Sequence, residues 1–214
     1  MNLELIQLQL KTFTEQDAED YCLLNNINPN NITELSLKDN ELTDISGIKL
    51  FKNLKDLYLG YNQITDISVL KNLKNLEILN LYNNKLTDIS ILKNLNNLKI
   101  LNIDNNKIRD ISVLKYLKNI EILDLFNNKI KDISVLKYLK LLQDLSLSNN
   151  KPTDISVLKY LKNLEILYIG NLKLELNQIQ YIKSLKNLKY LYCENGFKDM
   201  SILNKLNKNI KIIK

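Results

Sequence analysis

The sequence predicts an α/β solenoid, a curved right-handed superhelix with a parallel β-sheet on its concave face and 3₁₀ or short helices on its convex face. One observation is a 22-residue unit that recurs without interruption, for example at 76–97 as LEILNLYNNKLTDISILKNLNN. Another is the change of apolar period within each unit, from alternation to every third residue. Such self-similarity indicates stacked repeats that bury one continuous core. The copies begin at Ile32, Leu54, Leu76, Leu98, Ile120, Leu142 and Leu164, and a drifted copy begins at Leu188.

Three segments are expected along the chain. Residues 1–31 do not match the repeat and should form an N-terminal helical cap. Residues 32–209 should form about eight repeats, since few prolines and glycines interrupt them. Residues 210–214 contain Ile210, Ile212 and Ile213 and should add a C-terminal capping strand.

The cap is expected to contain one helix. Thr14 can cap it, with Asp17 at the third helical position and acidic residues in the first turn. Phe13, Tyr21 and Leu24 then offer an apolar face. This face should cover the open end of the first repeat, which would otherwise expose core leucines.

Each repeat should begin with a short strand. In the unit at 76–97, Leu79 and Leu81 should point inward while Ile78, Asn80 and Tyr82 point outward. Strands of successive repeats should then pair in parallel. An asparagine at the ninth position stands where the chain leaves the strand, and a buried amide there can satisfy backbone groups of its own repeat and of a neighbour. We therefore predict a stacked ladder of Asn40, Asn62, Asn84, Asn106, Asn128 and Asn150.

The second half of each repeat should form a helical turn. Ile89, Leu92 and Leu95 are three residues apart, which is the 3₁₀ period, and Ser90 stands where a cap would lie. An aspartate column could suggest a calcium ladder, but a calcium site needs several oxygens converging on one point. A local hydrogen bond at the start of each turn is the favoured interpretation. The column comprises Asp44, Asp66, Asp88, Asp110, Asp132 and Asp154.

The last repeats depart from the pattern. The seventh unit has 24 residues, and Leu172 replaces the asparagine. The extra residues precede Ile179 and Ile182, which favours a longer true helix there. Cys193 occupies an inward strand position of the eighth unit. Irregular final repeats are typical of caps.

The pattern L-x-x-L-x-L-x-x-N-x-[IL]-x-D-I-S-x-L-x-x-L-x-N resembles the leucine-rich repeats of bacterial internalins. Residues 54–75, LKDLYLGYNQITDISVLKNLKN, follow that consensus closely, and the resemblance covers 32 to about 209. It implies a curved solenoid, preceded by a helical cap, that binds proteins through its concave face. The signal peptide, Ig-like domain and surface anchor of secreted internalins are not recognisable here, which argues against a host-invasion role.

Catalysis has little support in the sequence. Histidine is absent, which removes the commonest general base and metal ligand. Cys22 and Cys193 lie at opposite ends of the expected solenoid, so we expect both to be reduced. No glycine-rich phosphate loop occurs. We expect a protein that is not an enzyme and takes no cofactor and no metal.

The outward strand positions are the candidate binding surface, because the core does not need isoleucines and aromatics there. Ile78, Ile100 and Ile122 should form one row with aromatic neighbours and a rim of aspartates. Strand propensity alone is the alternative explanation. The tyrosines at 168, 190 and 192 could form a separate contact or pack against the C-terminal cap. The candidates are Tyr58, Ile78, Asn80, Tyr82, Ile100, Asn102, Asp104, Ile122, Asp124, Phe126, Asp144, Tyr168, Tyr190 and Tyr192.

The favoured hypothesis is a monomeric protein-interaction module whose partner has a basic or aromatic surface. One alternative is a regulatory subunit, since the chain also resembles the leucine-rich repeat subunit of type 1 serine/threonine phosphatase. Another is binding of nucleic acid or an anionic surface through convex lysines, which the dispersal of those lysines disfavours. Membrane association is not expected. Without a visible signal peptide a cytoplasmic location is expected, and leaderless secretion or a removed leader stays open. The convex lysines include Lys71, Lys93, Lys115, Lys137 and Lys159.

Overall fold

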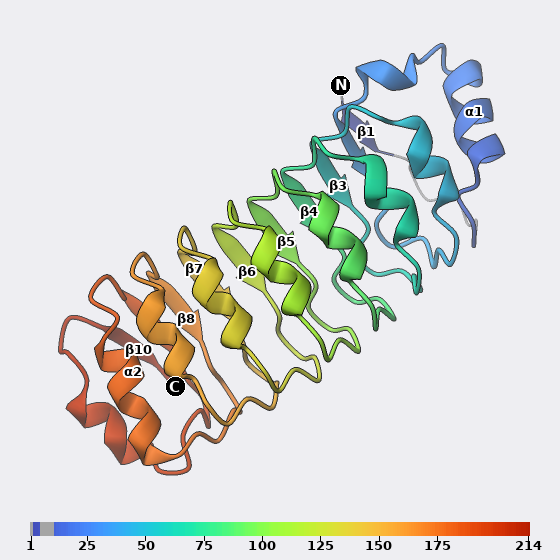
Figure 1. Cartoon of the computed structure of the whole chain (residues 1–214). Coiled ribbons are helices and arrows are strands. Elements are labelled where there is room, and N and C mark those ends of the chain that lie inside the picture. Colours follow the sequence, from blue (N-terminus) through green and yellow to red (C-terminus); the bar gives the residue numbers. More distant parts are fainter. Residues whose placement is uncertain (1, 5–10) are drawn as a thin grey trace.

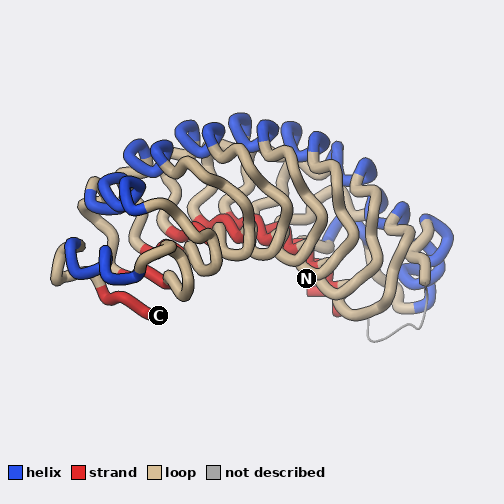
Figure 2. Tube along the Cα trace, turned by 90° about the horizontal axis from the view of Figure 1, so that it is seen from below, coloured by secondary structure: helices blue, strands red, loops and turns tan. Residues whose placement is uncertain are grey.

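The computed structural model describes residues 2–4 and 11–214 and shows an open, curved solenoid (Figure 1). Within the described residues, ten strands form one parallel sheet in chain order. Figure 2 shows these strands lining the inner curve while the helical turns line the outer curve. The strands are β1 (Asn2–Glu4), β2 (Glu34–Ser36), β3 (Asp56–Tyr58), β4 (Ile78–Asn80), β5 (Ile100–Asn102), β6 (Ile122–Asp124), β7 (Asp144–Ser146), β8 (Ile166–Tyr168), β9 (Tyr190–Tyr192) and β10 (Lys211–Ile213).

The convex face consists of single helical turns. Their apolar residues recur every third position, so each turn buries one edge against the core. Two α-helices lie near the ends, α1 (Glu15–Leu24) and α2 (Ile179–Lys183). The 3₁₀ helices are η1 (Pro29–Asn31), η2 (Ser46–Leu50), η3 (Ser68–Asn72), η4 (Ser90–Asn94), η5 (Ser112–Tyr116), η6 (Ser134–Tyr138), η7 (Ser156–Tyr160), η8 (Leu176–Gln178) and η9 (Met200–Lys205).

The core is a column of leucine and isoleucine side chains between the sheet and the turns. The strand leucines Leu57, Leu79, Leu101 and Leu123 are at most 1% exposed, which confirms the inward register of the strands. Equivalent residues pair across neighbouring strands, as in Leu79 with Leu101. The 22-residue period therefore sets the register of the sheet as well as its order.

The asparagine ladder is confirmed. Asn84 donates through Nδ2 to the carbonyl oxygens of Leu59 and Leu81, at 2.9 and 3.0 Å, and its Oδ1 accepts from the Ile64 amide at 2.9 Å. All six ladder asparagines are at most 8% exposed. Each amide from Asn62 to Asn150 thereby connects its own turn to the preceding repeat.

The aspartate column has the predicted local role. Asp88 Oδ1 accepts a hydrogen bond from the Ser90 amide at 2.7 Å, and the other five aspartates make the same bond. The expectation that Ser90 caps the turn is wrong, because Ser90 is the first residue of η4 and the Asp88 carboxylate supplies the capping oxygen. A carboxylate two residues earlier reaches the free amide more directly than the serine hydroxyl does.

The N-terminal cap differs in part from the prediction. Thr14 caps α1 and forms a reciprocal capping box with Asp17. Phe13 is buried and Tyr21 is partly buried against the core, but the prediction for Leu24 is wrong, since its side chain is 85% exposed. The inward stripe of α1 instead runs through Ala18 and Cys22, at helical spacing from each other.

The cap also contains a strand that the sequence did not predict. β1 pairs in parallel with β2 and extends the sheet by one strand. Residues 1 and 5–10 of the expected cap lie outside the described residues.

The C-terminal end matches the expectations for that segment. Residues 179–183 form the true helix α2, and the final strand β10 pairs with β9. Cys22 and Cys193 are both free and buried. In the described part of the chain, no helix combines the length and apolar character needed to cross a bilayer.

Candidate protein-binding surface

All fourteen predicted binding residues lie in β3–β9 or in the two residues that follow a strand. None of them is buried, although the leucines between them on the same strands are. Ile122 and Tyr190 are the most open, at 40% and 38% exposed. Figure 2 shows the strands lining the inner curve, and the solvent exposure of all fourteen side chains indicates that they face outward from the core on that side.

An apolar row crosses the centre of the concave face. Ile78 pairs with Ile100, and Ile100 pairs with Ile122, so three isoleucines stand side by side on adjacent strands. All three side chains keep solvent access. Isoleucines at these positions contribute nothing to the buried column, so this row is available for contact with another molecule.

Tyr82 lies two residues after β4, on the far side of the Asn80 column from this row, in a space made by a glycine. A Cβ atom added to Gly60 would come within 2.0 Å of Tyr82 Cε1, so the ring occupies the volume that a side chain at position 60 would fill. The Tyr61 ring meets the Tyr82 ring edge-on, with 4.7 Å between ring centroids. The two tyrosines therefore form a preformed aromatic pair.

Tyr61 is a candidate that the sequence reasoning missed. Its backbone is left-handed, with φ of 54°, and other repeats place Asn83, Asn105 and Asn127 at the equivalent position. Asparagine tolerates this conformation, whereas a bulky aromatic there is strained. Strained residues cluster at functional sites. The signal was present in the sequence as a tyrosine in a column of asparagines.

The middle outward column helps to hold the turn after each strand. The Oδ1 atoms of Asn80, Asn102 and Asp124 accept hydrogen bonds from the backbone amides two residues later, at 3.2, 3.0 and 2.9 Å. One of those amides belongs to Tyr82 and another to Phe126. These polar side chains therefore position the aromatic residues that follow them.

Three carboxylates lie near the centre of the face, with Asp124 in β6, Asp144 in β7 and Asp104 two residues after β5. Burial raises the pKa of Asp104, and the neighbouring Asp124 raises it further, although a hydrogen bond from Asn105 Nδ2 opposes the shift. Burial, together with the charge of Asp124, raises the pKa of Asp144 to about 6. Asp124 therefore lies close enough to both to disfavour their ionisation.

The C-terminal tyrosines divide into two groups. Tyr168 and Tyr192 stack, with centroids 4.2 Å apart and rings inclined by 13°. Burial raises the pKa of Tyr168 to about 12, with Asp144 as the next cause. Tyr190 stands apart from this pair, and Lys211 Nζ lies 5.9 Å from its ring centroid.

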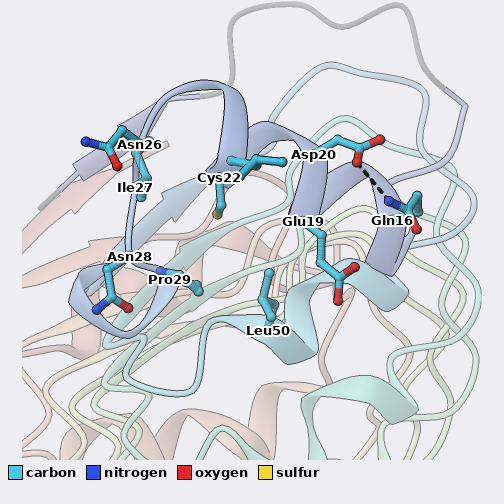
Figure 3. Close-up of a pocket in the computed structure, with 10 residues that line it drawn as sticks. Gln16, Glu19, Asp20, Cys22, Asn26, Ile27, Asn28, Pro29 and Leu50 are labelled. Carbon is cyan, nitrogen blue, oxygen red and sulfur yellow. Dashed lines mark hydrogen bonds between the residues drawn. The ribbon is translucent and has the colours of Figure 1, made fainter.

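Two other surfaces of the molecule have exposed aromatic rings or a hollow. The convex tyrosines Tyr116, Tyr138 and Tyr160 are exposed, and each ring lies next to a lysine ammonium. A hollow of about 600 Å³ lies beside α1 and is lined by Cys22, Pro29 and other cap residues (Figure 3). Glu19 and Asp20 of α1 also line this hollow. No cluster of three or more potential metal-ligating side chains was found among residues 2–4 and 11–214.

Comparison with known proteins places the repeats in a family. Residues 30–72, 74–116 and 118–160 each match the model described as Leucine Rich repeats (2 copies). The chain belongs to the leucine-rich repeat family. Proteins with this repeat are protein-interaction modules. No curated protein sequence is significantly similar to this leucine-rich repeat protein.

Solved structures show that the repeats are internalin-like. Internalin C2 of Listeria monocytogenes is 33% identical, with 94% of this chain and 84% of that chain covered and a TM-score of 0.75. The internalin InlF of the same organism is 29% identical, with 94% and 62% covered and a TM-score of 0.77. A leucine-rich repeat protein of Leptospira interrogans is 31% identical, with 79% and 45% covered and a TM-score of 0.69. The present chain thus spans about three fifths of the InlF structure.

Proposed function

We propose that this leucine-rich repeat protein is a non-enzymatic interaction module that docks a partner protein on its concave sheet. The observation that carries the proposal is the apolar row of Ile78, Ile100 and Ile122, which stays accessible to solvent on adjacent strands. Isolated apolar residues are common on protein surfaces, whereas a contiguous patch flanked by aromatics is typical of an interface.

The aromatic residues that follow β3 and β4 support the same proposal. Tyr82 fits over Gly60 and against Tyr61, so its ring is held in place before any partner arrives. Large aromatic side chains that lose little freedom on binding are the usual centres of binding energy. A strand preference for tyrosine would explain Tyr58 and Tyr82, but it does not explain a strained tyrosine at position 61.

The first experiment compares captured proteins. The protein is immobilised and exposed to an extract of the organism that encodes it, in parallel with a variant carrying Ile100→Glu, Tyr82→Glu and Phe126→Glu. We expect a specific partner to be retained by the natural sequence and lost by the variant, because buried charges at an interface centre carry a desolvation cost. Equal retention by both proteins would contradict docking on this face.

The second experiment measures affinity for that partner. Tyr82→Ala and Phe126→Ala should each weaken binding by more than about 1 kcal/mol, roughly fivefold in Kd. Tyr116→Ala is the matched control, since it removes a tyrosine that is 50% exposed on the convex face. An unchanged Kd in the two concave variants, or an equal loss in the control, would rule the proposal out.

A further inference from the structure

The concave face is acidic although the chain is basic. The net charge is +6, and the lysines lie mainly at positions outside the sheet surface. In the described chain, each repeat from β2 to β9 contributes three outward positions, two in the strand and one two residues after it. Together these positions hold six carboxylates and one lysine, Lys38. The six are Glu34, Asp56, Asp104, Asp124, Asp144 and Glu194. The separation of charge indicates that the partner surface is positively charged.

Other carboxylates close to the sheet are neutralised by lysines of the chain itself. Glu77 pairs with Lys99 at 2.6 Å, and Glu165 pairs with Lys189 at 2.6 Å. Each pair joins two neighbouring repeats, and all four residues lie immediately before the first residue of a strand. The chain can therefore supply a lysine to a carboxylate at the edge of the strands.

The central carboxylates of the face lack such a partner. Within the described residues, Asp104, Asp124 and Asp144 take part in no ion pair. The carboxylate of Asp144 also has no hydrogen-bond donor there, and burial raises its pKa to about 6. A charge that is partly desolvated without a counter-charge is stabilised by any cation that a partner brings.

The structure joins these carboxylates to the stacked tyrosines, which sequence reasoning kept apart. Asp124, Ser146, Tyr168 and Tyr192 are consecutive partners along one row of the sheet. Ser146 is small and only 8% exposed, so it separates the acid from the aromatic pair without projecting between them. Asp144 lies on the strand next to that of Tyr168 and Asp124 lies two strands away, and the charges of both raise the pKa of Tyr168 after burial does.

Carboxylates next to flat aromatic rings match the chemistry of a guanidinium group. Arginine forms paired hydrogen bonds with carboxylates and stacks on aromatic faces, whereas lysine offers a compact and strongly hydrated charge. A metal ion fits less well, because one Asp124 oxygen already accepts from the Phe126 amide. Tyr190 does not belong to this group, since Lys211 already lies next to its ring.

We propose that Asp124, Asp144, Tyr168 and Tyr192 form a recognition site for an arginine side chain on a basic segment of the partner protein. This inference rests on the proposed docking of a protein on the concave sheet, and it names the chemistry of that partner. The isoleucine row and the Tyr61 and Tyr82 pair then contact an apolar part of the same partner, toward the N-terminal half of the face.

The test uses fluorescein-labelled octa-arginine as the probe and follows its anisotropy at low ionic strength. The double variant Asp124→Asn and Asp144→Asn should raise the Kd about tenfold or more, since two unscreened carboxylates are lost from the site. Tyr168→Leu should raise it several-fold. Octa-lysine should bind the natural sequence more weakly than octa-arginine does, because it stacks less well on the tyrosines.

A matched control separates recognition from overall charge. Glu19→Gln with Asp20→Asn also removes two carboxylates, from the exposed side of α1, and should leave the Kd within about twofold because distant surface charges are screened. An equal loss in both double variants, or no loss in the Asp124 and Asp144 variant, would overturn the inference. Far-UV circular dichroism of each variant checks that the solenoid is intact.

The outcome is separable from that of the proposed function. The Kd of the partner could rise in the Tyr82 and Phe126 variants while the Kd of octa-arginine is unchanged in the Asp124 and Asp144 variant. In that case concave docking stands and arginine recognition fails. If instead only octa-arginine binding is weakened, by the Asp124 and Asp144 changes, the acidic site binds cations without the concave aromatic residues, and the proposed docking mode fails.

Discussion

One residue in each repeat has a backbone conformation that sets the sharp turn after the strand. The eighth position has φ values between 49° and 61° in Tyr61, Asn127, Asn149 and Asn171. Asparagine accepts this conformation at small cost, because its short side chain can bond locally. A tyrosine at the same place trades stability for a side chain that contacts Tyr82.

Tyr61→Asn should therefore stabilise the protein while weakening partner binding. Relief of the left-handed strain should raise the free energy of unfolding by about 1 kcal/mol, as measured by urea denaturation. Loss of the edge-on contact with Tyr82 should raise the Kd for the partner. Tyr116→Asn is the control at an ordinary backbone position, and a destabilised Tyr61→Asn protein would contradict the argument.

The asparagine ladder has two ends, and each is explained by a missing backbone partner. Every ladder Oδ1 from Asn62 onward accepts an amide hydrogen of the residue 20 positions earlier, as in Asn150 with Ile130. Asn40 has no repeat before it, and among residues 2–4 and 11–214 its buried Oδ1 has no hydrogen-bond partner. At the other end, the next ladder position is 172, and the residue 20 positions before it is Pro152, which has no amide hydrogen to donate. Leu172 replaces the asparagine at this position.

Pro152 and Leu172 should therefore be energetically coupled. Pro152→Ile alone leaves a buried amide unpaired and should cost about 1–3 kcal/mol. Leu172→Asn alone buries an acceptor opposite proline and should also destabilise. Together the two changes complete the next step of the ladder, so the double variant should be more stable than the sum of the singles by about 1–2 kcal/mol. Additive free energies of unfolding, measured in urea, would show that the ladder does not extend this way.

At the scale of elements, strands β6, β7 and β8 bring Asp124, Asp144 and Tyr168 together at a cost in stability. The folded-state pKa of Asp144 is about 6, above its ordinary value of 3.8. The neutral form of Asp144 therefore adds to the free energy of unfolding. This contribution is fully present below about pH 4 and is lost as the pH rises to about 6. These strands are thus less stable at neutral pH than their packing alone would allow.

Asp144→Asn should stabilise the protein at pH 7 and leave it nearly unchanged at pH 4. The gain at pH 7 should be about 1 kcal/mol once solvent screening of a partly exposed group is allowed for. Urea denaturation of both proteins at the two pH values measures the difference. A gain of the same size at pH 4 would point to packing and not to ionisation as its source.

The elements themselves were largely predictable, because the repeat dictates them. The apolar alternation placed the inward leucines and the outward rows such as Ile78, Ile100 and Ile122, and the irregular spacing after Leu172 indicated helix α2. Strand β1 was not predictable, because the first residues carry no copy of the repeat, and backbone pairing with β2 leaves no sequence pattern. The face of α1 was assigned incorrectly because Leu24 is apolar but lies off the stripe of Ala18 and Cys22.

The candidate binding surface was predictable only as a set of positions. The outward columns follow from strand geometry, but the sequence does not show that Tyr168 stacks on Tyr192 while Tyr190 stands apart, since side-chain rotamers decide that. The sequence also did not reveal a second row of asparagine side-chain amides that connect neighbouring repeats. Asn119 and Asn163 donate to backbone carbonyls of the preceding repeat at 2.9 Å, and Leu141, at the equivalent position, is 44% exposed.

At the scale of the whole molecule, each repeat contacts only its neighbours, so the ends decide whether the column stays closed. The N-terminal cap is held by the stacked rings of Phe13 and Phe51, 6.3 Å apart, and by a close approach at Gly47. A Cβ atom on Gly47 would lie 2.3 Å from the Thr14 carbonyl oxygen. The glycine allows α1 to pack directly on the first repeat.

Gly47→Ala should therefore loosen one end and leave the other intact. Because the obstacle is backbone, we expect a loss of about 2 kcal/mol or more in unfolding free energy. Hydrogen exchange should speed up in α1 and the first repeat, while amides of β6–β8 keep their protection. Ser46→Ala is the control at the neighbouring position. Uniform loss of protection along the chain would show instead that the solenoid unfolds as one unit.

The two ends of the asparagine ladder also decide where this chain can change its length. Between Asn62 and Asn150 each ladder amide meets the same backbone groups one unit away, so duplicating or deleting 22 residues there leaves each ladder bond with a partner. Beyond Pro152 the same change would misalign the register of the C-terminal helix and strands. The protein can therefore gain or lose units only in its middle, and the reach of its inner surface can be altered in fixed steps without rebuilding either end.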